Sequence, residues 1–395
     1  MKKVGIITYQ DIADGKGRFL QAYALYTVIN KLGYDAEIID YYPITMEGRT
    51  RPVLSKKIFK IMRNPKLLPN YIAKLQQCIL NKIFQKQLIE KRNKYESFIR
   101  ENIKVTDKKY YGYQSILEAN LCYDAFVCGS DQIWNPYFQG KDSGYYLQFA
   151  PKEKRIAYAP SLGTIQLDDE SKEILKSKIS EIPFVSVREK SGAKLISNLI
   201  GRNVENVLDP TLLLPKEWWD DFANETIITE RPYILTFLFD NSSYPRKVAK
   251  KLANEYGYDI ISIPDTLRDI FSYSHKEISI GPERFVSLFK NAAFVCTQSF
   301  HGTILSLIFN KPFYVFDRET KAYVSGVFSR IKDLLTMVGL EDRVLKSGED
   351  IPQNSLKIDY TRANDILESR RRESLEYLKK SLQQVTGGEN IVSVG

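Results

Sequence analysis

The 395-residue chain is poor in the side chains that most often bind metals or form disulfides. It has only two histidines, His275 and His301, and its four cysteines include no Cys-x-x-Cys pair. These counts exclude a polyhistidine metal centre, and we interpret the cysteines as small core residues in a reducing compartment. No resident metal or cofactor is predicted, and any imidazole chemistry has at most two candidates.

Long apolar runs and a leader-like start are also lacking. The richest apolar stretch, residues 304–309, is far shorter than the ~20 residues that cross a bilayer. The opening MKKVGIITY turns polar at Gln10 and Asp11, too soon for a secretory signal. Hydrophobic residues make up 43% of the chain, and Gly and Pro are scattered, which excludes a disordered or fibrous protein. We expect a cytoplasmic globular protein of two domains.

The net charge of +9 is concentrated in one stretch. Residues 49–94 contain 13 Lys and Arg against one acid, Glu90, a local charge of +12. The rest of the chain is therefore slightly acidic, and no nucleic-acid-binding motif accompanies the basic stretch. Nucleic acid is not expected as a partner.

The same stretch has apolar residues at helical spacing, which predicts a basic amphipathic helical insertion over 49–110. The apolar stripe consists of Ile72, Leu75, Ile79 and Ile83, flanked by Leu80, Phe84 and Leu88. The basic residues elsewhere on the helical wheel are Lys74, Lys82, Lys86 and Lys91. One interpretation is a helix docked on its domain with a solvated basic face. The other is a helix that rests on anionic lipid, which would make the protein peripheral at the inner membrane face.

Strand-like and helix-like segments alternate along the chain. Strands are predicted at 4–9, 36–42, 124–131, 155–161, 184–189 and 204–210, and then at 233–240, 258–264, 292–298 and 312–317. Helices are predicted at 19–32, 168–180, from 191, and at 245–256, 283–291, 301–309 and 326–338. This alternation is typical of α/β proteins with parallel sheets, so we predict two doubly wound Rossmann-like domains.

The domain boundaries follow from the break in this rhythm. Residues 1–220 form the predicted N-terminal domain, which contains the basic insertion. The segment 212–232 is interpreted as the linker, and residues 221–360 form the C-terminal, donor-binding domain. A helix at 361–384 and a tail at 385–395 end the chain. Loops at the carboxyl ends of two parallel sheets converge on ligands, so we expect a site between the domains.

The segment TQSFHGT (297–303) joins a strand to a helix and carries His301. Free amides at the start of that helix would bind carboxylate or phosphate, and Ser299, Gly302 and Thr303 lie there as caps or ligand contacts. His301 titrates near neutral pH and suits proton transfer. The alternative is that His301 only caps a turn.

Two further strand ends carry polar candidates. Arg188 follows an apolar strand and offers a planar fork for an anion, unless it forms a salt bridge within its domain. Residues 128–136 place Ser130, Asp131, Trp134 and Asn135 after another strand, in a combination that resembles a sugar-binding surface. A structural turn with Trp134 in the core is the alternative. The loop at 15–25 lacks full Gly-x-Gly-x-x-Gly spacing, so it is a weak nucleotide signature.

Six segments, in order over nearly the whole chain, resemble the polysaccharide pyruvyl transferase family. They are GKGRFLQAYAL (15–25), VCGSDQIWNP (127–136), VSVREKSG (185–192), LDPTLLL (208–214), TQSFHGT (297–303) and SRIKDLLTMVGLEDRV (329–344). The resemblance implies a GT-B-like fold and phosphoenolpyruvate as donor. It also implies a product in which a pyruvate ketal bridges two hydroxyls of a sugar, in a surface polysaccharide or its lipid-linked precursor.

The resemblance places the family's histidine at His301 and its strand-end arginine at Arg188. Many members have an arginine where this chain has Ser299, so Lys321 and Arg330 are candidates for the missing donor contact. The loop at 15–17 is Gly-Lys-Gly where the family often has Asn-Tyr-Gly. The predicted acceptor contacts are Gln21, Ser130, Asp131, Trp134 and Asn135. Two alternatives stay open: a GT-B glycosyltransferase that uses a nucleotide sugar, and a non-catalytic glycan- or lipid-binding protein.

Overall fold

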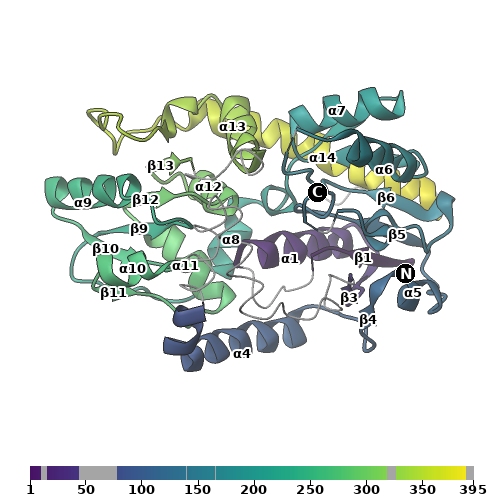
Figure 1. Ribbon diagram of the computed structural model, residues 1–395, viewed down its shortest axis with the longest axis horizontal. Helices are drawn as coiled ribbons and strands as arrows, with labels where there is room; N and C mark the ends of the chain where they lie inside the picture. The colour runs from purple at the N-terminus through teal and green to yellow at the C-terminus, as the bar shows by residue number, and fades with distance from the viewer. Residues whose placement is uncertain (10–15, 44–77, 139, 165, 318–325, 388–395) are drawn as a thin grey trace, which may run out of the picture.

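The computed structural model describes residues 1–9, 16–43, 78–138, 140–164, 166–317 and 326–387. Within these residues the strands form two six-stranded sheets and one two-stranded sheet, and all the paired strands are parallel (Figure 1). The prediction of two doubly wound Rossmann-like domains is confirmed.

The first sheet has the order β2-β1-β5-β6-β7-β8. Its strands are β1 (Lys3–Ile7), β2 (Asp35–Ile38), β5 (Ala125–Cys128), β6 (Arg155–Ala157), β7 (Phe184–Val187) and β8 (Glu205–Asn206). The helices of this domain are α1 (Lys16–Lys31), α5 (Gly112–Leu117), α6 (Asp169–Ile179) and α7 (Lys190–Ile200). Ile6 and Ile7 belong to different apolar clusters, as expected for a sheet buried on both faces.

The second sheet has the order β11-β10-β9-β12-β13-β14. Its strands are β9 (Tyr233–Phe237), β10 (Asp259–Ser262), β11 (His275–Lys276), β12 (Phe294–Thr297), β13 (Phe313–Phe316) and β14 (Val344–Leu345). Its helices are α9 (Tyr244–Tyr256), α10 (Leu267–Ser272), α11 (Pro282–Asn291), α12 (Phe300–Ile308) and α13 (Gly326–Val338). The two-residue strands β11 and β14 and the short helix α10 were not predicted, because segments so short carry no periodicity.

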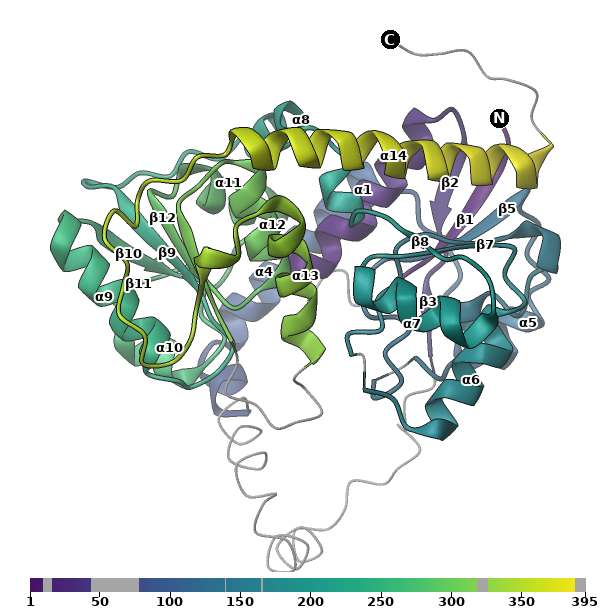
Figure 2. The same ribbon diagram turned by 90° about the horizontal axis from the view of Figure 1, so that it is seen from above.

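The final helix, α14 (Thr361–Thr386), runs from the second domain across to the first (Figure 2). The Ser374 hydroxyl accepts a hydrogen bond from the Leu208 amide at 3.0 Å, and Nε of Arg371 donates to the Leu212 carbonyl at 2.8 Å. The helix predicted at 361–384 therefore closes over the junction of the two domains.

The predicted linker at 212–232 is not structureless. It contains α8 (Lys216–Phe222), whose Trp219 is fully buried and donates from Nε1 to the Thr211 carbonyl at 3.0 Å. Trp219 also contacts the ring of Tyr23 on α1, with centroids 6.3 Å apart. The helix itself was not predicted, because the polar residues of this segment hide one short buried face.

The basic insertion is only partly described, since residues 44–77, including Ile72, Lys74 and Leu75, lie outside the described ranges. Its two ends meet where β3 (Tyr41–Tyr42) pairs with β4 (Tyr110–Tyr111). Between them, α4 (Gln85–Asn102) packs Tyr95 and Phe98 against Phe19 of α1. Nζ of Lys94 donates to the Ser279 carbonyl at 2.8 Å, so α4 touches both domains.

The described half of the amphipathic stripe differs from the prediction. Ile79 and Ile83 are exposed, whereas Lys91, predicted on the polar face, is buried with its ammonium 5.8 Å from the Tyr95 ring. The helical phase changes at Phe84, where a turn separates residues 78–83 from α4. A helical wheel that treats residues 72–91 as one continuous helix therefore assigns the apolar and polar faces incorrectly.

All four cysteines are free, but only Cys128 and Cys296 are buried; Cys78 and Cys122 are exposed, so they are not the core residues we expected. Among the described residues, no helix has the length and apolarity that a membrane span requires.

Candidate active site

The carboxyl ends of the two sheets face each other at the domain junction. In each sheet the strand order reverses at one point, between β1 and β5 in the first and between β9 and β12 in the second. Such switch points leave a crevice in which α/β proteins bind ligands. Asp131 follows β5, Arg188 follows β7, and His301 follows β12. The three side chains therefore converge from segments more than 50 residues apart in the sequence.

His301 is placed by the first turn of α12. The Ser299 hydroxyl caps this helix by accepting a hydrogen bond from the Gly302 amide at 3.2 Å. Gly302 leaves no room for a side chain, because a Cβ there would lie 2.6 Å from Oγ1 of Thr297. Thr303 donates its hydroxyl to the Ser299 carbonyl at 2.9 Å. The polar residues around His301 thus fix the helix start and hold the imidazole in place.

Gly17, at the start of α1, allows the first domain to approach His301 closely. A Cβ on Gly17 would lie 2.5 Å from Nδ1 of His301, a separation that real side chains do not adopt. As a nucleotide signature, the Gly-Lys-Gly loop is weak. Its second glycine is instead required for the contact between α1 and the imidazole.

Asp209, just after β8, joins the other two groups. Its Oδ2 accepts a hydrogen bond from Nη1 of Arg188 at 2.5 Å and lies 3.7 Å from Nε2 of His301. Oδ1 accepts from the Thr211 amide at 3.0 Å, which fixes the carboxylate. The salt bridge that was the alternative role for Arg188 is therefore present, and its partner is Asp209.

Phe300 lies beside two arginines from different domains. The guanidinium carbon of Arg188 is 4.2 Å from the ring centroid, and that of Arg330, on α13, is 5.5 Å away. Both arginines also approach Oδ1 of Asp131, Arg188 at 3.5 Å and Arg330 at 3.7 Å. The Phe300 ring and the Asp131 carboxylate thus stabilise the two guanidinium groups close together, although their like charges repel each other.

The electrostatics of this cluster favour a neutral imidazole and ionised aspartates. Burial, together with the charges of Arg188 and Arg330, lowers the pKa of His301 from its ordinary value, although Asp209 and Asp131 act to raise it. Burial alone would raise the pKa of both Asp131 and Asp209, but the charge of Arg188 leads a group of cations that outweighs it, so both values are lowered. Free protein at neutral pH therefore has a base at position 301.

Several buried polar atoms in the cluster have no hydrogen-bond partner among the described residues. They are Nε2 of His301, Nε and Nη2 of Arg188, and Oε2 of Glu189. Buried N–H groups without partners are costly, so the two of Arg188 indicate a place where an acceptor belongs. A cavity of about 770 Å³ reaches Arg188, Asp209, Phe300 and Arg330 from the side of α13 and α14. The arrangement can bind an anion and move a proton.

The structure does not give Gln21 and Ser130 the acceptor-binding roles we predicted. Both are fully buried. The Gln21 amide donates to Oγ1 of Thr8 and accepts from the Ser130 amide, each at 2.9 Å. The Ser130 hydroxyl donates to the Ala159 carbonyl at 2.8 Å. These residues hold the ends of β1 and β5 together. Of the predicted acceptor contacts, Asp131 joins the cluster with its side-chain charge, and Ser130 touches it through a hydroxyl 3.4 Å from Oδ2 of Asp209.

Trp134 and Asn135 are also corrected. The Trp134 side chain has an exposed fraction of 0%, stacks on Tyr146 with centroids 5.3 Å apart, and donates from Nε1 to the Tyr145 carbonyl. A ring covered in this way offers no face to a sugar. Oδ1 of Asn135 accepts from the Tyr137 amide at 3.1 Å, which makes it part of the same turn. The core interpretation of this motif is the correct one.

Lys321 lies outside the described residues. The functional residues that the sequence analysis missed are Asp209, Phe300 and Gly17. Asp209 lies in the LDPTLLL segment (208–214), and an acid directly before a proline at the end of an apolar strand-like run is the signal that could have identified it. Within the described ranges, no group of three or more His, Cys, Asp or Glu side chains could hold a metal ion.

The fold is thus that of an α/β protein of two Rossmann-like domains, with a buried cluster of cation, carboxylate and imidazole groups at their junction. A family model described as polysaccharide pyruvyl transferase matches residues 16–320. The match covers most of the chain and includes all the cluster residues except Arg330. The chain belongs to this family of transferases, as its motifs suggested, and its two-domain fold is GT-B-like.

Solved structures with similar folds share little sequence with this chain. MurG of Acinetobacter baumannii is 11% identical, with 98% of this chain and 95% of that chain covered and a TM-score of 0.42. UDP-GlcNAc 2-epimerase of Neisseria meningitidis, bound to UDP-GlcNAc, is 12% identical, with 98% and 94% covered and a TM-score of 0.46. ADP-heptose LPS heptosyltransferase II of E. coli is 11% identical, with 94% and 99% covered and a TM-score of 0.36. No curated protein matches the sequence.

Proposed function

We propose that the protein transfers the pyruvyl group of phosphoenolpyruvate to two hydroxyls of a sugar, which gives a pyruvate ketal and phosphate. The observation that carries the proposal is the contact of His301 with Asp209, whose carboxylate also accepts a hydrogen bond from Arg188, in a chain that belongs to the pyruvyl transferase family. The acceptor sugar belongs to a surface polysaccharide or its lipid-linked precursor.

The donor carries a carboxylate and a phosphate, so it needs cations. Arg188 and Arg330 supply them from opposite domains and are held near each other by Phe300. Two N–H groups of Arg188 have no hydrogen-bond partner among the described residues, which supports a role beyond the salt bridge to Asp209. Charged hydrogen bonds of this kind contribute about 1.5 to 3 kcal/mol each.

The reaction has two bond-forming steps. A proton adds to the methylene carbon of the donor, and the oxygen of one sugar hydroxyl bonds to C2 and loses its proton. The second hydroxyl then bonds to C2 as the C2–phosphate oxygen bond breaks, and its proton leaves with phosphate. The methylene becomes a methyl group, so atoms and charge balance without an added oxidant or metal.

His301 is the group that moves these protons. Burial lowers its pKa, so in free protein the imidazole is neutral and can accept a hydroxyl proton. A bound donor adds negative charge beside the ring, which raises the pKa and favours the imidazolium needed to protonate carbon. Asp209 contacts the ring edge and orients it, so it is a positioning residue rather than an acid or base.

The rival with the same fold is a glycosyltransferase that uses a nucleotide sugar. Calorimetric titration of the protein with phosphoenolpyruvate and, separately, with UDP-GlcNAc distinguishes the two. We expect saturable binding of phosphoenolpyruvate that weakens in the Arg330→Ala variant. Saturable binding of the nucleotide sugar, with none of phosphoenolpyruvate, would replace this proposal by the rival.

The basic insertion supports a peripheral position at an anionic membrane surface. Residues 49–94 carry a charge of +12, and the described part exposes Ile79 and Ile83 beside Lys82 and Lys86. Exposed apolar side chains among cations suit the interface of an anionic membrane. At that membrane surface the enzyme would encounter a lipid-linked acceptor.

A further inference from the structure

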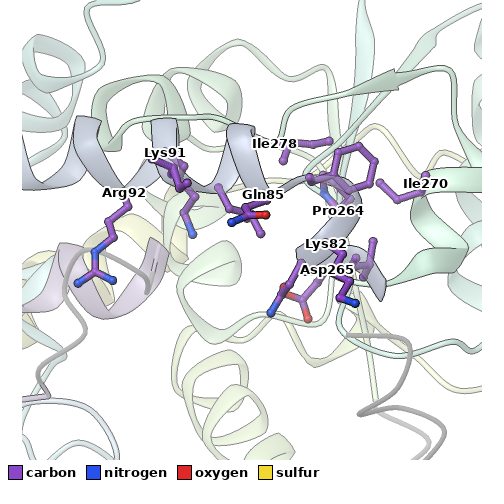
Figure 3. Close-up of a pocket in the computed structure, with 13 residues that line it drawn as sticks. Lys82, Gln85, Lys91, Arg92, Pro264, Asp265, Ile270 and Ile278 are labelled. Atoms are coloured by element: carbon purple, nitrogen blue, oxygen red, sulfur yellow. The ribbon is translucent and has the colours of Figure 1, made fainter. Parts of the chain in front are cut away.

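A second cavity lies apart from the cluster around His301, between the insertion and the second domain (Figure 3). It has a volume of about 640 Å³. One wall is formed by residues 80–92, at the start of α4 and just before it. The facing wall comes from the segment after β10, through α10, to residue 278. Since α4 bridges the domains, this cavity exists only because the insertion docks on the second sheet.

Most of the lining is apolar. Leu80, Phe84, Leu88 and Ile89 come from the insertion, and Pro264, Ile270 and Ile278 come from the second domain. The Ile89 side chain is 53% exposed although it faces this cavity. Apolar surface left in contact with water costs about 25 cal/mol per Å², so an apolar chain that covers these walls would be stabilised.

The charged part of the lining is predominantly positive, beside the neutral polar residues Asn81 and Gln85. Lys82, Lys91 and Arg92 are on the insertion side, and Asp265 is the acid opposite them (Figure 3). Lys91 is buried, so its charge is weakly screened by water. Cations beside an apolar cavity select an amphiphile with an anionic head group rather than a neutral lipid or a plain anion.

One residue, Arg92, lines both this cavity and a neighbouring one beside the end of β1. The neighbouring cavity has a volume of about 790 Å³, and its other lining residues include Thr8 and Tyr9. The Tyr9 ring lies 4.8 Å from the guanidinium carbon of Arg18, and Nε of Arg18 lies 3.9 Å from Oδ2 of Asp131. A head group held at Arg92 would therefore direct whatever it carries towards Asp131.

We propose that the apolar cavity binds the lipid of a lipid-phosphate-linked acceptor, with its hydrocarbon between α4 and the second domain. Lys82, Lys91 and Arg92 bind the phosphate, and the attached sugar extends past Tyr9 to the cluster at Asp131 and His301. This inference rests on the proposed function, because it assigns an acceptor class to that site. It differs from docking on a membrane surface, since the hydrocarbon enters the protein.

The test uses dodecyl phosphate, below its micelle concentration, as the probe and the full chain as the protein. Binding is followed by calorimetry against two controls, inorganic phosphate and dodecyl maltoside. We expect dodecyl phosphate to bind at least tenfold more tightly than dodecyl maltoside, and inorganic phosphate not to compete with it. Equal affinity for both dodecyl compounds, or no binding of dodecyl phosphate, would overturn the proposal.

Two matched pairs of variants locate the site. Ile89→Glu alters the cavity wall, whereas Ile83→Glu alters an equally exposed isoleucine that does not line it. Lys82→Glu and Lys86→Glu form the corresponding charge pair. We expect Ile89→Glu and Lys82→Glu to weaken dodecyl phosphate binding about tenfold, and the other two to change it less than twofold. Equal losses within each pair would mean that only surface charge attracts the probe, which contradicts a cavity site.

The outcome is separable from that of the proposed function. Phosphoenolpyruvate binding at Arg188 and Arg330 does not involve the cavity, so it should be unchanged in Ile89→Glu. If phosphoenolpyruvate binds and dodecyl phosphate does not, the lipid site is wrong and the donor assignment stands. If only dodecyl phosphate binds, the lipid site stands and the donor assignment fails.

Discussion

Nε2 of His301 lies 3.7 Å from Oδ2 of Asp209, and the two residues come from different domains. Asp209 follows β8 of the first sheet, and His301 follows β12 of the second. The same carboxylate oxygen accepts a hydrogen bond from Arg188. The imidazole therefore has its charged neighbours only when the two domains are in contact, which makes domain arrangement part of the chemistry.

Substitutions of Arg188 and Asp209 should have strongly coupled effects on the free energy of unfolding. Both side chains are buried, so Arg188→Ala leaves an unpaired buried carboxylate and should cost about 3 to 5 kcal/mol of unfolding free energy. In the Arg188→Ala/Asp209→Ala double variant that carboxylate is gone, so the loss should be well below the sum of the single losses. Urea denaturation of all four proteins measures this, and additive losses would contradict the pairing.

Gly17 should be essential for the placement of the imidazole. In Gly17→Ala the new methyl group would meet His301 at 2.5 Å, so α1 or the ring must shift. A displacement of about 1 Å in a catalytic group can reduce turnover about 10²-fold. We expect kcat to fall on that scale with a nearly unchanged melting temperature. Gly33→Ala is the control for a loss of kcat that arises only from a glycine-to-alanine change in the fold. No atom lies within 4 Å of a Cβ at Gly33, although its φ is positive.

His301 should make stability depend on pH. Its pKa in the folded protein lies below the ordinary 6.5, because burial disfavours the imidazolium. As pH falls through 6.5, the unfolded chain takes up a proton that the folded protein resists, so stability decreases until the folded pKa is reached. Urea midpoints between pH 7.5 and 5.5 should therefore fall more in wild type than in His301→Gln. Identical pH dependence in both proteins would contradict a lowered pKa.

The basic insertion should bind anionic vesicles reversibly. Each Lys or Arg that reaches an anionic surface contributes about 1 kcal/mol, and the attraction weakens as salt rises. Simultaneous change of Lys74, Lys82 and Lys86 to Glu should greatly reduce cosedimentation with phosphatidylserine-containing vesicles at low salt. The exposed basic residues Arg372 and Lys380 of α14 provide a charge-reversal control away from the insertion. A wild-type protein that ignores such vesicles would show that the basic face is only solvated.

Much of the fold could be predicted from the sequence because buried parallel strands are continuous apolar runs. The apolar runs that form β9 and β12 end in polar turns. These turns made the ends of both strands, and the position of His301 after β12, predictable from the sequence. Elements of two residues, such as β11, and the phase change at Phe84 could not be predicted, since neither leaves a periodic signal.

The candidate site was predicted less completely, for a different reason. His301 and Arg188 are unusual residues directly after strands, so they were identifiable one at a time. Trp134 was misplaced because a polar turn around a tryptophan looks the same whether the ring faces solvent or the core. Asp209 gains its importance from contacts with residues 21 and 92 positions away in the chain, and sequence spacing does not reveal such contacts.

The most direct test of the central claim is phosphate release from phosphoenolpyruvate in the presence of lipid-linked and free oligosaccharide acceptors, with mass spectrometry of the acceptor. The account predicts one phosphate released for each pyruvate ketal formed. It also predicts that His301→Ala lowers the rate by about 10² to 10⁴ while donor affinity stays within about tenfold. Ketal formation at a near-normal rate by His301→Ala would contradict the role of the imidazole. Release of nucleoside diphosphate from a nucleotide sugar, with no phosphate from phosphoenolpyruvate, would contradict the account as a whole.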